Sequence, residues 1–259
     1  MNDLIQIIFL SIIQGVTEFL PISSSAHLNF IPKLLKWDAL GLPLEVSMHF
    51  GSLLAVIYYY IKYKNEFINL ESTKNYIGFE KITIGSAPVL FFGFFFYDYI
   101  ANNLRGMEII GISTIFVAIL LIIVEFFKKE YKNISNINNL DIFFIGLLQA
   151  TSLIPGTSRS AVIILGALLL GYNKKSAIII TLILSVPVIL IAMLYEIYSI
   201  DYFSINIGLI FKTSISIIIS FLTSYIVIKY FVSYINKIGF YPFMIYRLAL
   251  GIFLLSVFT

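Results

Sequence analysis

The chain has 259 residues, of which 59% are hydrophobic and only 12% charged, and its formal net charge is +3. An ordinary soluble domain carries roughly 25% charged residues, so this composition excludes a soluble globular protein and indicates an integral membrane protein. The sequence contains no cysteine, which excludes disulfides and thiolate metal sites, and the small, dispersed charge gives no indication of nucleic-acid binding.

Six apolar runs are long enough to cross about 30 Å of hydrocarbon. In chain order they cover residues 43–61, 82–100, 107–127, 176–195, 207–228 and 240–258. Two further segments, 4–30 and 141–170, are interrupted by prolines and polar residues. Irregular backbone at membrane depth is tolerated only where it is buried in protein or lines a wet cavity. We therefore predict an all-α integral membrane protein with six transmembrane helices plus two re-entrant helical hairpins.

The ends and loops predict the orientation of these segments. The N-terminal MNDLIQII lacks a basic leader, so we expect no removable signal peptide. If both hairpins return to the side they entered from, one side of the membrane receives Lys62, Lys64, Lys74, Lys81, Lys128, Lys129, Lys132, Lys174, Lys175, Lys229 and Lys237. The other side receives Lys33, Lys36, Arg105 and Lys212. The positive-inside rule makes the first side cytoplasmic and places both chain termini outside.

The two interrupted segments resemble each other. The first contains QGVTEFLPISSSAHL, from Gln14 to Leu28, and the second contains QATSLIPGTSRSAVI, from Gln149 to Ile163. A shift of 135 residues, without a gap, aligns Gln14 with Gln149, Ser23 with Ser158, Ser25 with Ser160 and Ala26 with Ala161. The pattern predicts an internal duplication within a single membrane domain.

Each copy would hold one hairpin and three spans, which is an odd number of crossings. The second copy, 138–259, is therefore predicted to be inverted relative to the first, 1–132. Inverted-repeat membrane folds place their sites near the midplane, at the interface between the repeats. We expect the two hairpin tips to meet there, within reach of one pyrophosphate.

The second tip, PGTSRS, has the residue types of a phosphate-binding site. The planar fork of Arg159 suits a phosphate oxyanion better than a lysine would. Backbone amides around Gly156, next to a helix N-terminus, would add donors and a favourable dipole. We assign Arg159 to the phosphates of the substrate, with Gly156, Ser158 and Ser160 as further binding residues.

The first tip has the residue types of catalytic machinery. His27 can act as a nucleophile or general acid near neutral pH. Glu18 can orient or deprotonate it, or hold a divalent cation on the phosphates. Ser24 and Ser25 are alternative nucleophiles, and Ser23 is assigned to substrate binding.

Structural interpretations of the same residues stay open. Serines in membrane helices often bond back to the helix, Gln14 can satisfy freed backbone groups, and Glu18 with Arg159 can be an internal ion pair.

These residues also carry a family resemblance. QGVTEFLPISSSAH resembles the (E/Q)xxxE signature, with its trailing serines and histidine, of the undecaprenyl-diphosphate phosphatase family, also called bacitracin-resistance proteins. PGTSRS resembles the second signature of that family, PGxSRS. Supporting stretches are LEVSMHFGSLLAV, SAPVLFFG and PFMIYRLALG. Two positions differ from forms found in the family, since Gln14 stands where some members carry Glu and Ile163 stands where a Thr often follows.

The resemblance implies hydrolysis of undecaprenyl diphosphate to undecaprenyl phosphate and inorganic phosphate. This reaction recycles the lipid carrier of peptidoglycan and other envelope polymers, and it confers bacitracin resistance. The expected location is the cell inner membrane, with an active site that faces the extracytoplasmic side. The expected catalytic residues are Glu18, His27, Ser24, Ser25 and Arg159, and Gln14 joins the substrate-binding set.

Further expectations complete this interpretation. Glu18 is the candidate ligand of a Mg or Ca ion, with no organic cofactor. The partners are a prenyl diphosphate lipid and the bilayer, with no nucleic acid, and a homodimer is left open. A polyprenyl-phosphate flippase or small-molecule transporter is the alternative function, because inverted repeats with broken helices are transporter architecture. Arg247 is given a supporting role, and two arrangements stay open for it: a pair across the core with an acid such as Glu45, or snorkelling to the interface.

Overall fold

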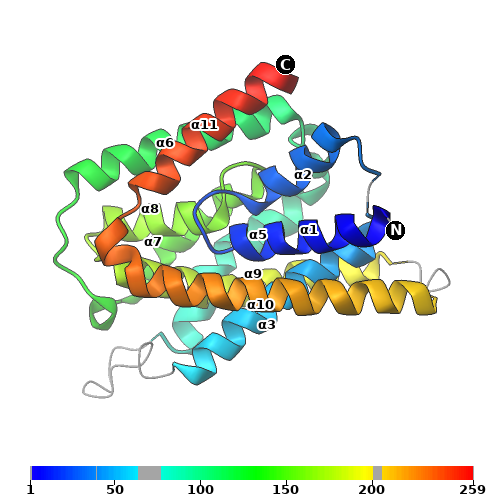
Figure 1. The fold of residues 1–259 in the computed structure, drawn as a ribbon. Coiled ribbons are helices and arrows are strands. Elements are labelled where there is room, and N and C mark those ends of the chain that lie inside the picture. Colours follow the sequence, from blue (N-terminus) through cyan, green and yellow to red (C-terminus); the bar gives the residue numbers. More distant parts are fainter. Residues whose placement is uncertain (1, 39, 64–76, 201–205, 259) are drawn as a thin grey trace.

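The computed structural model describes residues 2–38, 40–63, 77–200 and 206–258 (Figure 1). Within these residues, 6 helices are long and apolar enough to cross a membrane. They lie in α3 (Leu42–Lys62), α5 (Phe79–Asn103), α6 (Met107–Phe127), α9 (Lys174–Tyr198), α10 (Ile207–Ile238) and α11 (Tyr241–Phe258). The six predicted spans are thereby confirmed.

One of the long helices extends well beyond the span predicted for it. α10 continues past residue 228 to Ile238, because Phe231, Val232 and Ile235 keep one face of it buried. The apolar stripe of a helix that packs on a core follows this spacing.

The remaining helices form two hairpins. The first consists of α1 (Asn2–Thr17) and α2 (Ser24–Leu35). The second consists of α7 (Asn139–Ala150), the short 3₁₀ helix η2 (Thr151–Leu153) and α8 (Arg159–Leu169). At about 1.5 Å per residue, each α-helix here is shorter than the roughly 30 Å of a bilayer core. The re-entrant topology is a prediction that these lengths allow.

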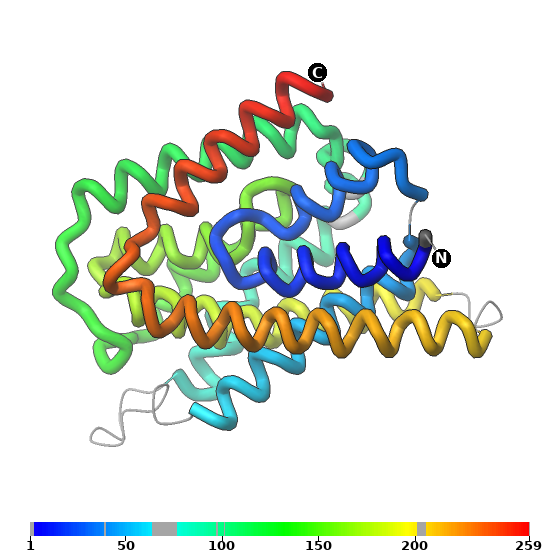
Figure 2. The backbone as a smooth tube through the Cα atoms, viewed as in Figure 1, coloured from blue at the N-terminus to red at the C-terminus, as the bar shows by residue number. Residues whose placement is uncertain are grey.

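The two hairpin loops lie close together in the middle of the molecule, between the crossed pair α6 and α11 and the long helix α10 (Figure 2). Contacts between the loops agree with this view, because the Ser160 hydroxyl donates to the Leu20 carbonyl at 2.8 Å. Arg159 of the second hairpin also forms an ion pair with Glu18 of the first. The prediction that the tips meet is confirmed.

The helix that follows each loop starts in the same way. Ser23 precedes α2 with φ 71°, and Ser158 precedes α8 with φ 68°. Each hydroxyl accepts from a backbone N–H three residues on, Ala26 at 3.3 Å and Ala161 at 3.4 Å. A left-handed φ is uncommon outside glycine, and serine is a preferred N-cap. The two loops thus share one strained conformation at positions 135 residues apart, as a duplication would produce; the repeat boundaries remain a prediction.

Small residues let each hairpin approach a long helix of the other half. A Cβ added to Gly15 of α1 would collide with Thr223 of α10, and one added to Gly146 of α7 would collide with the Gly85 backbone of α5. Close backbone approach at small residues is a common way for helices to associate in membranes. The first hairpin therefore rests on α10 and the second on α5.

Hydroxyl groups reinforce the contacts of α10. Ser216 lies 3.0 Å from Ser11 of α1, measured between the hydroxyl oxygens. Ser220 and Ser224 lie 2.9 Å and 3.0 Å from the hydroxyl of Ser52 in α3. Polar side chains commonly hold helices together where lipid supplies no hydrophobic driving force. This serine row fixes α1 and α3 against the same face of α10.

Candidate active site

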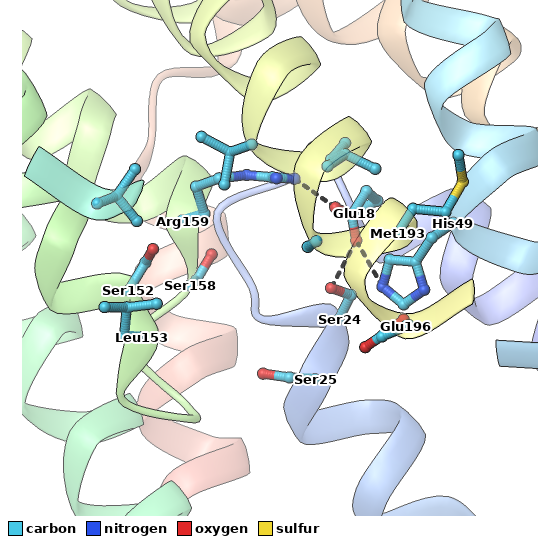
Figure 3. Close-up of a pocket in the computed structure, with 14 residues that line it drawn as sticks. Glu18, Ser24, Ser25, His49, Ser152, Leu153, Ser158, Arg159, Met193 and Glu196 are labelled. Carbon is cyan, nitrogen blue, oxygen red and sulfur yellow. Dashed lines mark hydrogen bonds and ion pairs between the residues drawn. The ribbon is translucent and has the colours of Figure 1, made fainter. Parts of the chain in front are cut away.

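A pocket of about 230 Å³ lies where the two hairpin tips meet (Figure 3). Its polar wall consists of Glu18, Ser24 and Ser25 from the first tip, Ser152, Ser158 and Arg159 from the second, His49 from α3 and Glu196 from α9. Its apolar wall consists of Val89, Leu153, Val188, Ile189, Ala192 and Met193. Half of the predicted site residues therefore line one cavity.

Glu18 is the centre of the hydrogen-bond network in this pocket. One carboxylate oxygen, Oε1, pairs with the guanidinium of Arg159. The other, Oε2, accepts from Ser24 Oγ at 2.8 Å and from Gln14 Nε2 at 2.8 Å. Figure 3 shows Arg159 and Glu18 pointing toward each other across the pocket, with Ser24 below Glu18. Buried charges in a membrane protein require such partners.

Two helices begin at the pocket. α2 starts at Ser24 and α8 starts at Arg159, so the first residue of each helix is a pocket residue. The first turn of a helix has N–H groups without intrahelical acceptors, and its dipole is positive there. Two helix N-termini directed at one cavity create a site for an anion.

Gln14 does not line the pocket that its residue type was predicted to serve. Its side chain is fully buried, and its amide donates to Glu18. Gln14 therefore contacts the Glu18 carboxylate from behind and does not line the cavity.

Three further predicted binding residues also lie behind the pocket wall. Ser23 is the N-cap of α2, and the hydroxyl of Ser160 donates a hydrogen bond to the Leu20 carbonyl. Gly156 has φ +95°, and a Cβ there would collide with Ser113 and Ile110 of α6. A left-handed φ at such a close approach requires glycine. These residues shape the tips, and the structure places none of them among the pocket residues.

His27 is packed away from the pocket. Its Nδ1 lies 2.7 Å from the Ser23 carbonyl, and its Nε2 lies 2.5 Å from the hydroxyl of Tyr246 in α11. A carbonyl only accepts, so Nδ1 donates and the neutral ring accepts from Tyr246 with Nε2. The ring also stacks on Tyr246 with an interplanar angle of 5°. Both nitrogens are engaged, which leaves neither free to attack phosphorus.

His49 and Glu196 are pocket residues that the sequence analysis did not select. His49 Nδ1 donates to the Glu45 carbonyl at 2.9 Å, and Nε2 lies 4.0 Å from Glu18 Oε2. Nδ1 is therefore used on its own helix, and Nε2 is the ring nitrogen that faces the Glu18 carboxylate in the pocket (Figure 3). An ionisable side chain within a membrane span is a functional candidate by default, and that signal was present at His49, whereas Glu196 lies one residue beyond the span predicted for 176–195 and inside α9 as the structure has it.

Arg247 is fully buried and holds both tips from behind. Its Nη2 donates to the carbonyls of Gly156 at 3.0 Å, Thr157 at 3.1 Å and Thr114 at 3.2 Å. Its Nη1 donates to the Pro21 carbonyl at 3.4 Å. The expected pairing with Glu45 is wrong, because backbone carbonyls of both loops already surround the guanidinium.

The carboxylates of the pocket bear on the question of a metal ion. Glu18 and Glu196 both line the cavity, while no cluster of three or more His, Cys, Asp or Glu side chains occurs in the part of the chain that the structure describes. Mg²⁺ is commonly bound by one or two carboxylates together with substrate phosphates. These residues fit a cation that is held jointly with a phosphate-bearing substrate.

Comparisons with known proteins cover nearly the whole chain. A family model described as "Bacitracin resistance protein BacA" matches residues 7–253. The "Undecaprenyl-diphosphatase" of Ruthia magnifica subsp. Calyptogena magnifica is 38% identical over 264 residues, which is 97% of this chain and 98% of that protein. The protein of the same name from Thioalkalivibrio sulfidiphilus is 36% identical over 267 residues, with 99% of each chain covered. The similarity includes both hairpins and all the long helices.

Proposed function

This chain belongs to the bacitracin resistance protein BacA family, and we propose from that premise how its paired tips perform the family reaction. The protein is a multi-pass membrane phosphatase that dephosphorylates undecaprenyl diphosphate. The observation that carries the assignment of roles is the contact between Ser24 Oγ and Glu18 Oε2 at 2.8 Å, beside Arg159. A hydroxyl within hydrogen-bond reach of a base, which a third group orients, is the arrangement of an activated nucleophile.

Substrate binding uses the positive groups of the pocket. The terminal phosphate lies between the N-termini of α2 and α8, and Arg159 exchanges part of its contact with Glu18 for phosphate oxygens. Arginine presents a planar fork that matches two of these oxygens. The hydroxyls of Ser25, Ser152 and Ser158, which line the same cavity, donate to the remaining oxygens.

The first chemical step transfers the terminal phosphoryl group to Ser24. The Ser24 oxygen attacks phosphorus, its proton passes to Glu18, and the bond to the bridging oxygen breaks. Undecaprenyl phosphate leaves with the electron pair of that bond. Arg159 and the two helix dipoles stabilise the charge that spreads over the equatorial oxygens.

The second step releases inorganic phosphate. Water attacks the phosphoserine, its proton passes to Nε2 of His49, and Glu18 returns a proton to the departing Ser24 oxygen. His49 then loses its proton to the phosphate or to bulk water, which restores the starting state. Nε2 suits this role because Nδ1 already donates to the Glu45 carbonyl. His27 has no part in either step.

A divalent cation belongs to this proposal as an additional ligand of the diphosphate. Glu18 and Glu196, which line the pocket from different elements, would hold it, and it would neutralise charge on the phosphate oxygens. The proposed location is the inner membrane, with the pocket facing the extracytoplasmic side. The distribution of lysines in the loops supports the orientation of the helices, and the family resemblance supports the side to which the pocket opens.

The test is phosphate release from undecaprenyl diphosphate by the purified protein in detergent, with and without a chelator. We expect release by the wild type and a labelled phosphoenzyme intermediate whose label is located at Ser24. A label on another residue, or turnover by Ser24→Ala at the wild-type rate, refutes the assignment of the nucleophile. Activity that withstands the chelator removes the cation from the proposal and leaves the roles of the side chains unchanged.

A further inference from the structure

The substrate is larger than the pocket that cleaves it. The cavity at the tips has about 230 Å³, whereas pockets that enclose a drug-sized ligand measure about 300–1,000 Å³. The diphosphate fills this cavity, and the long prenyl chain has to leave it. The inference below rests on the proposed function and concerns the path of that chain.

A second, apolar groove adjoins the pocket, and we call it the α5–η2 groove. It has about 480 Å³ and is lined by Phe92, Phe96, Tyr99, Ile100, Leu104, Leu147, Ala150, Thr151, Leu153 and Ile154. Leu153 also lines the pocket, so the groove and the cavity share a wall. The one hydroxyl of η2 in this wall, on Thr151, donates to the Leu148 carbonyl at 2.7 Å. The groove therefore suits an apolar ligand.

One stripe of α5 runs from the pocket along the whole groove. Val89 lines the pocket, and Phe92, Phe96 and Tyr99 follow in the groove. Steps of three and four residues keep these side chains on one face of the helix. From Val89 to the end of α5 at Asn103 the helix rises about 21 Å at 1.5 Å per residue. Because Phe92, Phe96 and Tyr99 are 39%, 47% and 61% exposed, the groove is open to lipid along its side.

Gly93 lies on the same stretch of α5 and faces Leu153, the residue that the pocket and the groove share. A Cβ built there would meet only Leu153, at 3.6 Å, which is an ordinary contact. Gly85 on the same helix differs, because a Cβ there would press against Leu184 at 2.7 Å. Close helix packing thus explains Gly85 and does not explain Gly93. Glycine in the middle of a helix is unfavourable, and its effect at this position is to leave space beside Leu153.

We propose that the α5–η2 groove binds the prenyl chain of the substrate, which leaves the pocket past Leu153 through the space beside Gly93. The chain then lies along the aromatic face of α5, and it enters sideways from the bilayer without being threaded through the protein. The groove would make the enzyme bind a long-chain diphosphate more tightly than free diphosphate.

A competing path exists on the opposite side of the pocket. A groove between α3, α9 and α10 includes Phe50, Thr213 and Ile217 and touches the pocket at Met193. Met193 is only 6% exposed and belongs to the main hydrophobic core. A chain that took this path would have to displace a packed core residue. The α5–η2 groove requires no such displacement.

The decisive variant is Gly93→Phe, which fills the space beside Leu153, and the matched control is Thr213→Phe, which fills the competing groove. For Gly93→Phe we expect at least a tenfold rise in KM for C55 diphosphate in detergent. Inorganic pyrophosphate reports on the phosphate site alone, so its Ki as a competitor should change by less than twofold. Thr213→Phe should leave both constants within twofold of the wild type.

Three results would each overturn the proposal. In Gly93→Phe, these are an unchanged KM for C55 diphosphate, or equal weakening of the binding of C55 diphosphate and pyrophosphate. The third is a rise in KM that occurs only in Thr213→Phe. A second measurement covers a variant that does not fold. A C55 diphosphate with a photoreactive group in the chain should label wild-type peptides between Phe92 and Leu104. Labelling of α3 or α10 would refute the path. If the wild type binds and is labelled on α5 without releasing phosphate, the proposed function fails while the groove stands.

Discussion

Replacing Arg247 by methionine tests whether this residue holds the tips together or contacts the substrate. Methionine keeps most of the length of the side chain and removes the charge and all the donors. Four backbone carbonyls lose a partner, those of Thr114, Pro21, Gly156 and Thr157. The Gly156 carbonyl retains the Thr114 hydroxyl at 3.2 Å. The substitution therefore loosens both hairpin loops at once.

The expected cost follows from these contacts. A hydrogen bond to a charged group contributes roughly 1.5–3 kcal/mol, and part of the sum is offset because the buried guanidinium no longer has to be desolvated. Single substitutions beyond about 4–5 kcal/mol are exceptional. We expect a loss of about 3–5 kcal/mol for Arg247→Met. Arg247→Lys keeps the charge but loses the planar fork, and about 1–3 kcal/mol is expected.

The assay is the thermal unfolding midpoint of the purified protein in detergent, followed by phosphate release from the folded fraction. For a chain of this size, 1 kcal/mol corresponds to a shift of about 2–4 °C, so Arg247→Met should lower the midpoint by about 6–20 °C. Lys212→Met is the control, since its exposed pair with Asp3 contributes less than about 1 kcal/mol. If Arg247→Met melts like the wild type while turnover falls by more than a hundredfold, the reasoning is wrong and Arg247 contacts the substrate.

Other substitutions separate the roles proposed for the pocket residues. Ser24→Ala should reduce phosphate release by at least a thousandfold, because no nucleophile remains, whereas Ser25→Ala should cost less than about tenfold; equal losses in the two variants would contradict this. Arg159→Lys should lower kcat/KM by about 10–100-fold with an unchanged melting temperature, because a single point charge replaces the planar guanidinium. Wild-type kinetics in this variant would refute the contact between Arg159 and phosphate. His49→Ala should slow the second step, so that the phosphoenzyme accumulates in a rapid-quench experiment; no accumulation would remove His49 from that step. His27→Ala should lower the free energy of unfolding by about 1–3 kcal/mol, because its hydrogen-bond partners lose their contacts. The folded fraction should keep kcat within about threefold of the wild type. A loss of turnover without a loss of stability would return His27 to the mechanism.

The membrane spans could be predicted because their signal is local. The length of each apolar run can be read directly from the sequence and compared with the length that a helix needs to cross the bilayer. The position of the breaks was also local, because Pro21 and the PGTSRS motif combine proline with runs of polar residues, whereas Pro88 and Pro187, in apolar surroundings, lie inside α5 and α9. The meeting of the tips was predicted from the offset of 135 residues, which relates the two breaks without any knowledge of packing.

The direction in which individual side chains point could not be predicted from the same signals. His27 follows Ser24 by less than one helical turn, yet its ring is held by Tyr246, 219 residues away in the sequence. His49 and Glu196 lie within long apolar helices, where the sequence does not state which face meets the pocket. That choice depends on how α3 and α9 pack, and the serine row on α10 sets part of this packing. Non-local packing therefore decided the positions of His27, His49 and Glu196, whereas Gln14 and Ser23 are held by partners within four residues.

The contact between Arg247 and the first hairpin has a consequence for biosynthesis. Pro21 and Arg247 are 226 residues apart, and a ribosome adds roughly 5–20 residues per second. The first hairpin therefore waits about 11–45 s after its own synthesis before α11 can reach it. Glu18 also lacks Arg159 for about the first 7–28 s of that interval, because the two residues are 141 apart in the sequence. A nascent chain that stalls before α11 is made would lack the Arg247 donors for the carbonyls of both hairpin loops.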